Sequence, residues 1–358
     1  MKIKIIHYPF FLMMFLTMIS SSSCSFFHHK SLAKKEAIVY PSAPDTARIQ
    51  YLTTINGSNF LGKRSKFATF VLGKEEIKAI NKPFGVVIRD GILYICDPGV
   101  GGIEIMDMNK GTYKVFSPGG SGQFKTPLTC IVDTNAYMYV ADAGLHEVLI
   151  FDSLHNFYKR IKDTGDYKPT DVFIFENELW VTNPTRHTLT IYDKKTAEFK
   201  RNFSNYESGD DGFLYSPYNI FITNDLVYVT DFGDFKIKVF DHQGKYIKSI
   251  GSYGTGVGQF VRPKGIACDK ESNLYVVDAG FENTQIFNKE GQILMFFGGP
   301  YKGPGDMWLP ARVTIDYENM EYFSKYVDPA YDLKYIVIVS NQYGPDKVNI
   351  YGAVVPKK

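Results

Sequence analysis

A short unit recurs six times along this chain, and this internal repetition constrains the fold more than any other feature of the sequence. Each copy opens with a proline, and the copies follow one another at steps of 44, 42, 48, 46 and 47 residues, at Pro83, Pro127, Pro169, Pro217, Pro263 and Pro310. Each proline precedes an apolar run, and a second apolar run then ends in Asp or Asn, at Asp97, Asp142, Asn183, Asp231, Asp278 and Asn341. β-branched and aromatic residues fill these runs, and Gly, Asp and Asn separate them. The pattern therefore predicts short β-strands joined by hairpins.

The length of the repeat is that of a four-stranded propeller blade, so the sequence predicts an all-β, six-bladed β-propeller over residues 47–358. The last unit lacks an outer strand of its own, since little more than Ala353, Val354 and Val355 follows its inner strands. Residues 48–55, RIQYLTTI, are similar to the outer strands YIKSIG and ILMFFG of two other units. We therefore expect this N-terminal strand to complete blade six and to close the ring.

The first 23 residues have the layout of a secretory signal peptide. Two lysines lie at the start, a mostly apolar stretch covers residues 5–19, and four serines occupy residues 20–23. The apolar stretch is short for a transmembrane helix and lacks the flanks of one. The sequence thus predicts an exported protein.

The residue after the serines is Cys24, and small residues before a cysteine resemble the signal of bacterial lipoproteins. That resemblance implies lipidation of Cys24 and attachment to the cell envelope, on the outer membrane. Ser21 departs from the pattern because leucine is usual there, so export without a lipid is the alternative. Residues 24–46 contain two prolines and a charged cluster, and we expect a flexible tether between lipid and ring.

Charge excludes one class of partner. The chain carries 40 Lys+Arg and 38 Asp+Glu, and loss of the leader's two lysines brings the formal balance from +2 to 0. No basic footprint for nucleic acid is present, and we expect membrane contact only through the lipid anchor. After Cys24 three cysteines remain, Cys96, Cys130 and Cys268, all within apolar runs. They are expected to be buried unpaired thiols, because no haem-attachment or CxxC spacing occurs.

The fifth unit carries the clearest resemblance to a known family. Residues 258–294 read GQFVRPKGIACDKESNLYVVDAGFENTQIFNKEGQIL, which resembles the NHL repeat nearly position for position. Residues 40–52, YPSAPDTARIQYL, look like the same segment in exported NHL lipoproteins of bacteria rich in multihaem cytochromes. The resemblance implies a protein- or ligand-binding scaffold that is accessory to extracytoplasmic cytochrome or envelope assembly. The implied partner is an extracytoplasmic protein or a small ligand, and no cofactor is expected.

The runner-up is an enzyme, a propeller lyase or lactonase with a metal site that the sequence does not reveal. Calcium-dependent lactonases place Asn or Asp directly after the repeat proline, where this chain has Phe84, Leu128, Thr170, Tyr218, Lys264 and Ala311. Peptide-amidating lyases use several histidines on zinc. Here two ring histidines, His146 and His187, follow second strands, whereas His155 and His242 follow third strands and should lie on the opposite face. We therefore expect no metal site and no catalytic residues.

Polar substitutions in the repeat indicate where a ligand or partner could bind. The glycine two residues after the proline is kept in two units and replaced in the others by Thr129, Asp171, Asn219 and Arg312. These positions begin the innermost strands and therefore surround one mouth of the central channel. We predict a contact site formed by Asp171, Asn219 and Arg312, with Arg186 and His187 on a hairpin of the same face. Solvated or mutually paired side chains are the alternative.

The aspartates that end four of the second strands have a simpler explanation. Asp97, Asp142, Asp231 and Asp278 recur at one position of the repeat. A residue repeated in most blades does the same local work each time, so we expect these carboxylates to accept backbone N–H bonds in turns.

Overall fold

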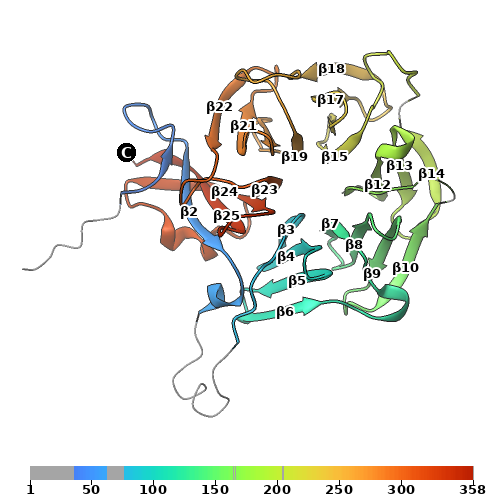
Figure 1. Ribbon diagram of the computed structural model, residues 1–358, viewed down its shortest axis with the longest axis horizontal. Coiled ribbons are helices and arrows are strands. Elements are labelled where there is room, and N and C mark those ends of the chain that lie inside the picture. The colour runs from blue at the N-terminus through green and yellow to red at the C-terminus, as the bar shows by residue number, and fades with distance from the viewer. Residues whose placement is uncertain (1–35, 63–75, 164, 166, 204, 358) are drawn as a thin grey trace, which may run out of the picture. The chain divides into compact units, whose positions relative to one another are not determined.

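The computed structural model describes residues 36–62, 76–163, 165, 167–203 and 205–357. The expected signal peptide, Cys24 and residues 25–35 of the expected tether lie outside them. The residues from Ala37 to Lys358 form one compact unit. Six antiparallel sheets surround a common axis, with β3, β7, β15, β19 and β23 near the axis and β6, β10, β14, β18 and β22 at the rim (Figure 1). The predicted all-β six-bladed propeller is thus confirmed.

The strands follow the repeat in order. Blade one contains β3 (Val86–Arg89), β4 (Ile92–Asp97), β5 (Gly102–Asp107) and β6 (Thr112–Phe116), and blade two contains β7 (Pro127–Val132), β8 (Met138–Asp142), β9 (Glu147–Phe151) and β10 (Phe157–Lys162). Blade three contains β11 (Val172–Phe175), β12 (Glu178–Asn183), β13 (Thr188–Asp193) and β14 (Phe199–Phe203), and blade four contains β15 (Pro217–Ile222), β16 (Val227–Asp231), β17 (Lys236–Phe240) and β18 (Tyr246–Ile250). Blade five contains β19 (Pro263–Cys268), β20 (Leu274–Asp278), β21 (Asn283–Phe287) and β22 (Ile293–Gly298), and blade six contains β23 (Pro310–Asp316), β24 (Tyr331–Asn341), β25 (Val348–Pro356), β2 (Ile49–Ile55) and β1 (Val39–Tyr40).

Helical structure among the described residues is limited to single 3-10 turns. These turns are Ser58–Leu61, Gly120–Gly122, Pro184–Arg186, Met320–Tyr322 and Ser324–Tyr326. Within the same ranges, no helix is both long and apolar enough to cross a bilayer.

The N-terminal strand closes the ring as expected. β2 pairs antiparallel with β25, from Ile49 opposite Ala353 to Ile55 opposite Val348, and so supplies the fourth strand of blade six. Pairing the two ends of the chain in one sheet covers an edge that the last blade would otherwise expose.

The sheet of blade six continues one strand further than the sequence predicts. β1 pairs with β2 through Val39 opposite Gln50, although these residues fall in the range 24–46 expected to be a tether. The Tyr40 ring lies 6.2 Å from the Phe297 ring, and its hydroxyl donates to the carbonyl of Gly305 at 2.9 Å. Two paired residues are too few for a periodic sequence pattern, which is why composition alone favoured a linker here.

The hydrophobic core lies between neighbouring blades. The cluster between blades four and five, for example, joins Val239 of β17, Phe260 of the connecting loop and Val276 of β20, all fully buried. The second and third strands of a blade are therefore buried on both faces, as in β8 and β9, which explains the continuous apolar runs of the sequence, whereas outermost strands such as β14 are largely exposed. The three cysteines of the ring are buried and unpaired, as expected.

The recurrent aspartates accept backbone hydrogen bonds, which confirms their expected structural role. The Asp142 carboxylate accepts four backbone N–H groups at 2.8 to 3.0 Å, two from the loop before the blade, Lys125 and Thr126, and two from its own turn, Gly144 and Leu145. Equivalent sets of bonds surround Asp97, Asp231 and Asp278. Each carboxylate thus fastens the incoming loop to the end of a second strand.

Two repeat glycines are explained by close approach of the next blade. A β-carbon at Gly85 would lie 2.7 Å from the Leu128 carbonyl oxygen, and one at Gly265 would lie 2.6 Å from the Arg312 α-carbon. Side chains are therefore excluded at these two positions near the axis. The other four positions of the ring carry side chains.

Candidate functional site: the mouth of the central channel

The residues that begin the innermost strands gather around one end of the axis. Their side chains reach across the mouth of the channel, so that residues of non-adjacent blades touch. Neighbouring blades are also joined here, because Thr129 and Thr170 donate to carbonyl groups of the following blade, Thr170 and Tyr218, at 3.3 and 2.8 Å. Side chains at the mouth therefore help to hold neighbouring blades together, so their identity matters for the fold.

An ion pair spans the mouth. Arg312 of blade six donates to the Asp171 carboxylate at 2.5 Å, and Asp171 belongs to blade three on the opposite side of the ring. The Asp171 side chain is fully buried and that of Arg312 is 13% exposed. The same carboxylate oxygen accepts the backbone N–H of Ile220 at 3.0 Å. Two of the three predicted contact residues are thus brought together, as a mutual pair.

Asn219, the third predicted residue, belongs to β15 and is buried beside this pair. Neither its amide oxygen nor its amide nitrogen bonds to any described protein group, and the second carboxylate oxygen of Asp171 has no such partner either. Buried polar atoms without partners cost about 1 to 3 kcal/mol each, so this end of the channel retains unused hydrogen-bonding capacity.

Lys264 of blade five is the residue that sequence reasoning missed as a contact. Its side chain is buried, its ammonium lies 5.4 Å from the centre of the Phe84 ring, and no carboxylate among the described residues pairs with it. Burial, together with the charges of Arg262 and Lys82, lowers the pKa of Lys264 to about 8. The signal available in the sequence was a lysine at the position that directly follows a repeat proline.

Aromatic rings complete the mouth. Phe84 of blade one lies 6.2 Å from Tyr218 of blade four, and Tyr218 lies 5.8 Å from Phe232. Burial, together with the Asp171 charge, raises the pKa of the Tyr218 hydroxyl, so this hydroxyl stays neutral. Because the Phe84–Tyr218 contact crosses the axis, the protein's own side chains occupy the mouth, and a ligand would bind on top of them.

Cations surround Lys264. The charges of Arg262 and Lys82 act on its ammonium, and Asp171 already neutralises Arg312. The Asp97 and Asp278 carboxylates also lie at this end of the ring, where they accept the backbone N–H groups of Lys82 and Arg262. Lys264 is therefore the group at the mouth that attracts an anion most directly.

Arg186 and His187 each contact a loop that enters a blade. Arg186 pairs with Asp163. The His187 Nδ1 atom lies 2.8 Å from the Tyr215 carbonyl oxygen, and His146 makes the same contact with the Tyr167 carbonyl oxygen at 2.7 Å. Both histidines thus connect the hairpin of one blade to the loop that enters the next.

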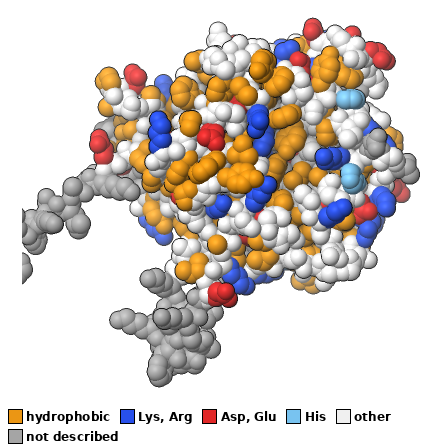
Figure 2. Space-filling view, viewed as in Figure 1, with side chains coloured by type: hydrophobic (Ala, Val, Ile, Leu, Met, Phe, Trp, Pro, Cys, Tyr) orange, Lys and Arg blue, Asp and Glu red, His pale blue; other side chains and the backbone are white. Residues whose placement is uncertain are grey.

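The surface view places hydrophobic side chains near the centre of one face of the ring, with lysine and arginine among them (Figure 2). Within the described residues, no group of three or more His, Cys, Asp or Glu side chains is arranged to hold a metal ion. The mouth presents cationic, amide, hydroxyl and aromatic groups together with the Asp171 carboxylate.

Comparison with known proteins supports the fold. A family model described as a 6-bladed beta-propeller matches residues 195–292. No curated protein sequence matches this chain.

Several solved structures are similar in shape. A structural genomics protein of unknown function from Bacteroides thetaiotaomicron superposes with a TM-score of 0.57 at 13% identity, over 86% of this chain and 76% of that one. A catalytically inactive virginiamycin B lyase from Staphylococcus aureus, solved with quinupristin, gives a TM-score of 0.54 at 13% identity, over 76% of this chain and 95% of the lyase. Identities this low establish a common fold alone.

Proposed function

We propose that this chain is an exported, lipid-anchored β-propeller that acts as a non-catalytic binding module, and that its channel mouth binds an anionic group of an extracytoplasmic protein or small ligand. The observation that carries the proposal is Lys264. Lys264 is 9% exposed and pairs with no described carboxylate, and a bound anion would supply an acceptor for its ammonium.

The neighbouring charges strengthen the argument. Arg262 and Lys82 repel the Lys264 ammonium, and both repulsions are screened when an anion binds between the cations. Asp171 forms its ion pair with Arg312 through one carboxylate oxygen, which also accepts the Ile220 amide, and it forms no ion pair with Lys264.

The proposed cellular setting rests on sequence features. Residues 1–23 resemble an export signal, and Cys24 stands where a lipidated cysteine would begin the mature chain. The resemblance to exported NHL lipoproteins supports a role as an accessory to cytochrome or envelope assembly. A lipid anchor would hold the ring close to such machinery, which raises the effective concentration of a weak binding site.

Isothermal titration calorimetry with inorganic phosphate and with benzoate tests the proposal. We expect both anions to bind wild-type protein at pH 7, and benzoate to bind better because aromatic rings line the mouth. Lys264→Met should weaken binding at least about tenfold, since a charge-assisted hydrogen bond contributes about 1.5 to 3 kcal/mol. Lys245→Met is the matched control, because Lys245 is exposed on the β17–β18 turn. Equal affinities for the two variants would overturn the proposal.

A further inference from the structure

A second cavity lies where blade five meets blade six, away from the mouth. Its volume is about 360 Å³, within the range of small-molecule sites. The turn between β19 and β20 lines it through Glu271 and Asn273, and so does the first half of β24 through Lys334. Because strands alternate in direction and β20 and β24 both end at the mouth, this cavity opens on the opposite face of the ring.

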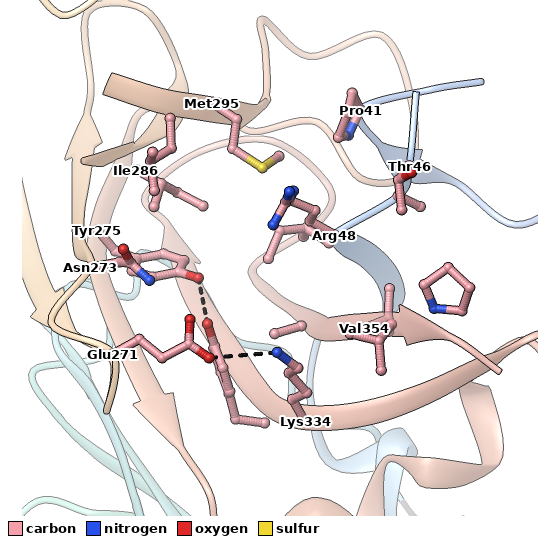
Figure 3. A pocket seen from close by; sticks show the side chains of 17 residues that line it. Pro41, Thr46, Arg48, Glu271, Asn273, Tyr275, Ile286, Met295, Lys334 and Val354 are labelled. Atoms are coloured by element: carbon pink, nitrogen blue, oxygen red, sulfur yellow. Dashed lines mark hydrogen bonds and ion pairs between the residues drawn. The ribbon is translucent and has the colours of Figure 1, made fainter. Parts of the chain in front are cut away.

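Part of the cavity wall is apolar. Ile286, Met295 and Val354 contribute aliphatic and thioether surface from three different strands (Figure 3). The hydroxyl of Tyr335 donates to the Asp269 carboxylate at 2.9 Å, and the Tyr275 hydroxyl lies 2.8 Å from the Tyr335 hydroxyl. Since Tyr335 uses its proton on Asp269, Tyr275 is the donor between the two tyrosines. Both protons are committed, so neither hydroxyl is left to donate to a ligand.

One cation at the cavity is uncommitted. Glu271 and Lys334 pair with each other at 3.5 Å and balance their charges. Arg48 lines the same cavity, is exposed, and forms no ion pair with any described residue. In Figure 3 the Arg48 side chain reaches over the cavity from the β2 side, toward Met295 and Ile286. The cavity therefore combines an apolar interior with a single free guanidinium at its opening.

We propose that this cavity binds a small amphiphilic anion, with an aliphatic body against Ile286, Met295 and Val354 and a carboxylate, sulfate or phosphate group on Arg48. The guanidinium offers paired N–H donors that match such oxyanions. The site is separate from the mouth and does not depend on the function proposed there. It also uses the closing strand, because Arg48 immediately precedes β2.

Calorimetric titration of the purified protein with straight-chain carboxylates tests the site. From butanoate to octanoate, affinity should rise by up to about fourfold per methylene group as apolar surface is buried. At equal chain length, octanoate should bind more tightly than 1-octanol, and octylamine should bind less tightly than either. Absence of octanoate binding at millimolar concentration, or equal binding of octanoate and octylamine, would overturn the proposal.

Three variants locate the site. Arg48→Gln should lower octanoate affinity about three- to fivefold and leave 1-octanol affinity unchanged, because the lost contact is an exposed charge pair. Arg89→Gln is the matched control, since Arg89 pairs only with Asp90 in blade one, at 3.5 Å. Ala353→Leu should weaken the binding of both octanoate and 1-octanol, because the larger side chain fills the cavity. If this variant does not fold, the chain-length series in the wild-type protein tests the apolar interior instead. Equal octanoate affinity in Arg48→Gln and Arg89→Gln would exclude the proposed anion contact.

Discussion

Removal of Arg312 should destabilise the ring far more than removal of an ordinary surface arginine. Asp171 is fully buried, and after Arg312→Met its carboxylate would keep a single bond, from the Ile220 amide. Breaking a buried ion pair by removing one partner costs about 3 to 5 kcal/mol. Because Arg312 is 13% exposed and water can reach the site, we expect the lower end of this range, about 3 kcal/mol.

The assay is a double-mutant cycle followed by urea and thermal unfolding. About 3 kcal/mol corresponds to a fall in Tm of about 4 to 5 °C for a ring of this size. Asp171→Asn combined with Arg312→Met leaves no uncompensated charge, so the double variant should be more stable than Arg312→Met alone, with a coupling energy of at least about 2 kcal/mol. Arg201→Met serves as control, because Arg201 is 43% exposed in its pair with Glu178 and should contribute about 1 kcal/mol or less.

Two results would refute this reasoning. If Arg312→Met and Arg201→Met have the same stability, the cross-channel pair does not hold blades three and six together. If the double variant is as unstable as the sum of the single variants, the two side chains act independently.

Three further outcomes are expected. Deletion of residues 48–55 should cause aggregation or a markedly lower Tm, because the edge of β25 becomes unpaired. Deletion of residues 25–35 should leave Tm unchanged. Equal stability of the two truncations would exclude closure by β2. Burial, and then the neighbouring Asp97 charge, raise the pKa of Glu104 to about 8 from its usual 4.5. Between these pH values the folded protein keeps a proton that the unfolded chain has lost, so the free energy of unfolding should fall as pH rises from about 5 to 8. Glu104→Gln should flatten this dependence in urea titrations at a series of pH values. Cys24→Ser should move the protein from the membrane fraction to the soluble exported fraction, and an unmodified cysteine in the mass spectrum of the mature wild-type N terminus would rule out the anchor.

The repeat made most of the fold predictable. A proline before each inner strand and an Asp or Asn after each second strand mark local turns, and local hydrogen bonds such as those of Asp142 are what a short sequence pattern encodes. Closure by residues 48–55 was also predictable, because a missing outer strand and an unmatched strand at the other end of the chain belong together. β1 was not, since its two residues are held by tertiary contacts with Phe297 and Gly305.

The sequence predicted which positions surround the site, but not the contacts between their side chains. The sequence indicated that Asp171, Asn219 and Arg312 surround one mouth, but the pairing of Asp171 with Arg312 depends on how far each side chain reaches across the axis. Arg186 and His187 share the face, yet their distances from the axis could not be judged from strand order. Lys264 was overlooked because its chemistry arises from burial against Phe84, which no sequence spacing reports.

Proton uptake on anion binding tests the central claim most directly. With the Lys264 pKa near 8, part of the population of this lysine is neutral at pH 8, and a bound anion should favour the charged form. Calorimetry of benzoate binding at pH 8, in buffers of different ionisation enthalpy, should show uptake of a fraction of one proton by the wild-type protein and by Lys245→Met. The same titration of Lys264→Met should show none. Binding without proton uptake in the wild-type protein, or identical uptake in Lys264→Met, would contradict an anion site at the mouth.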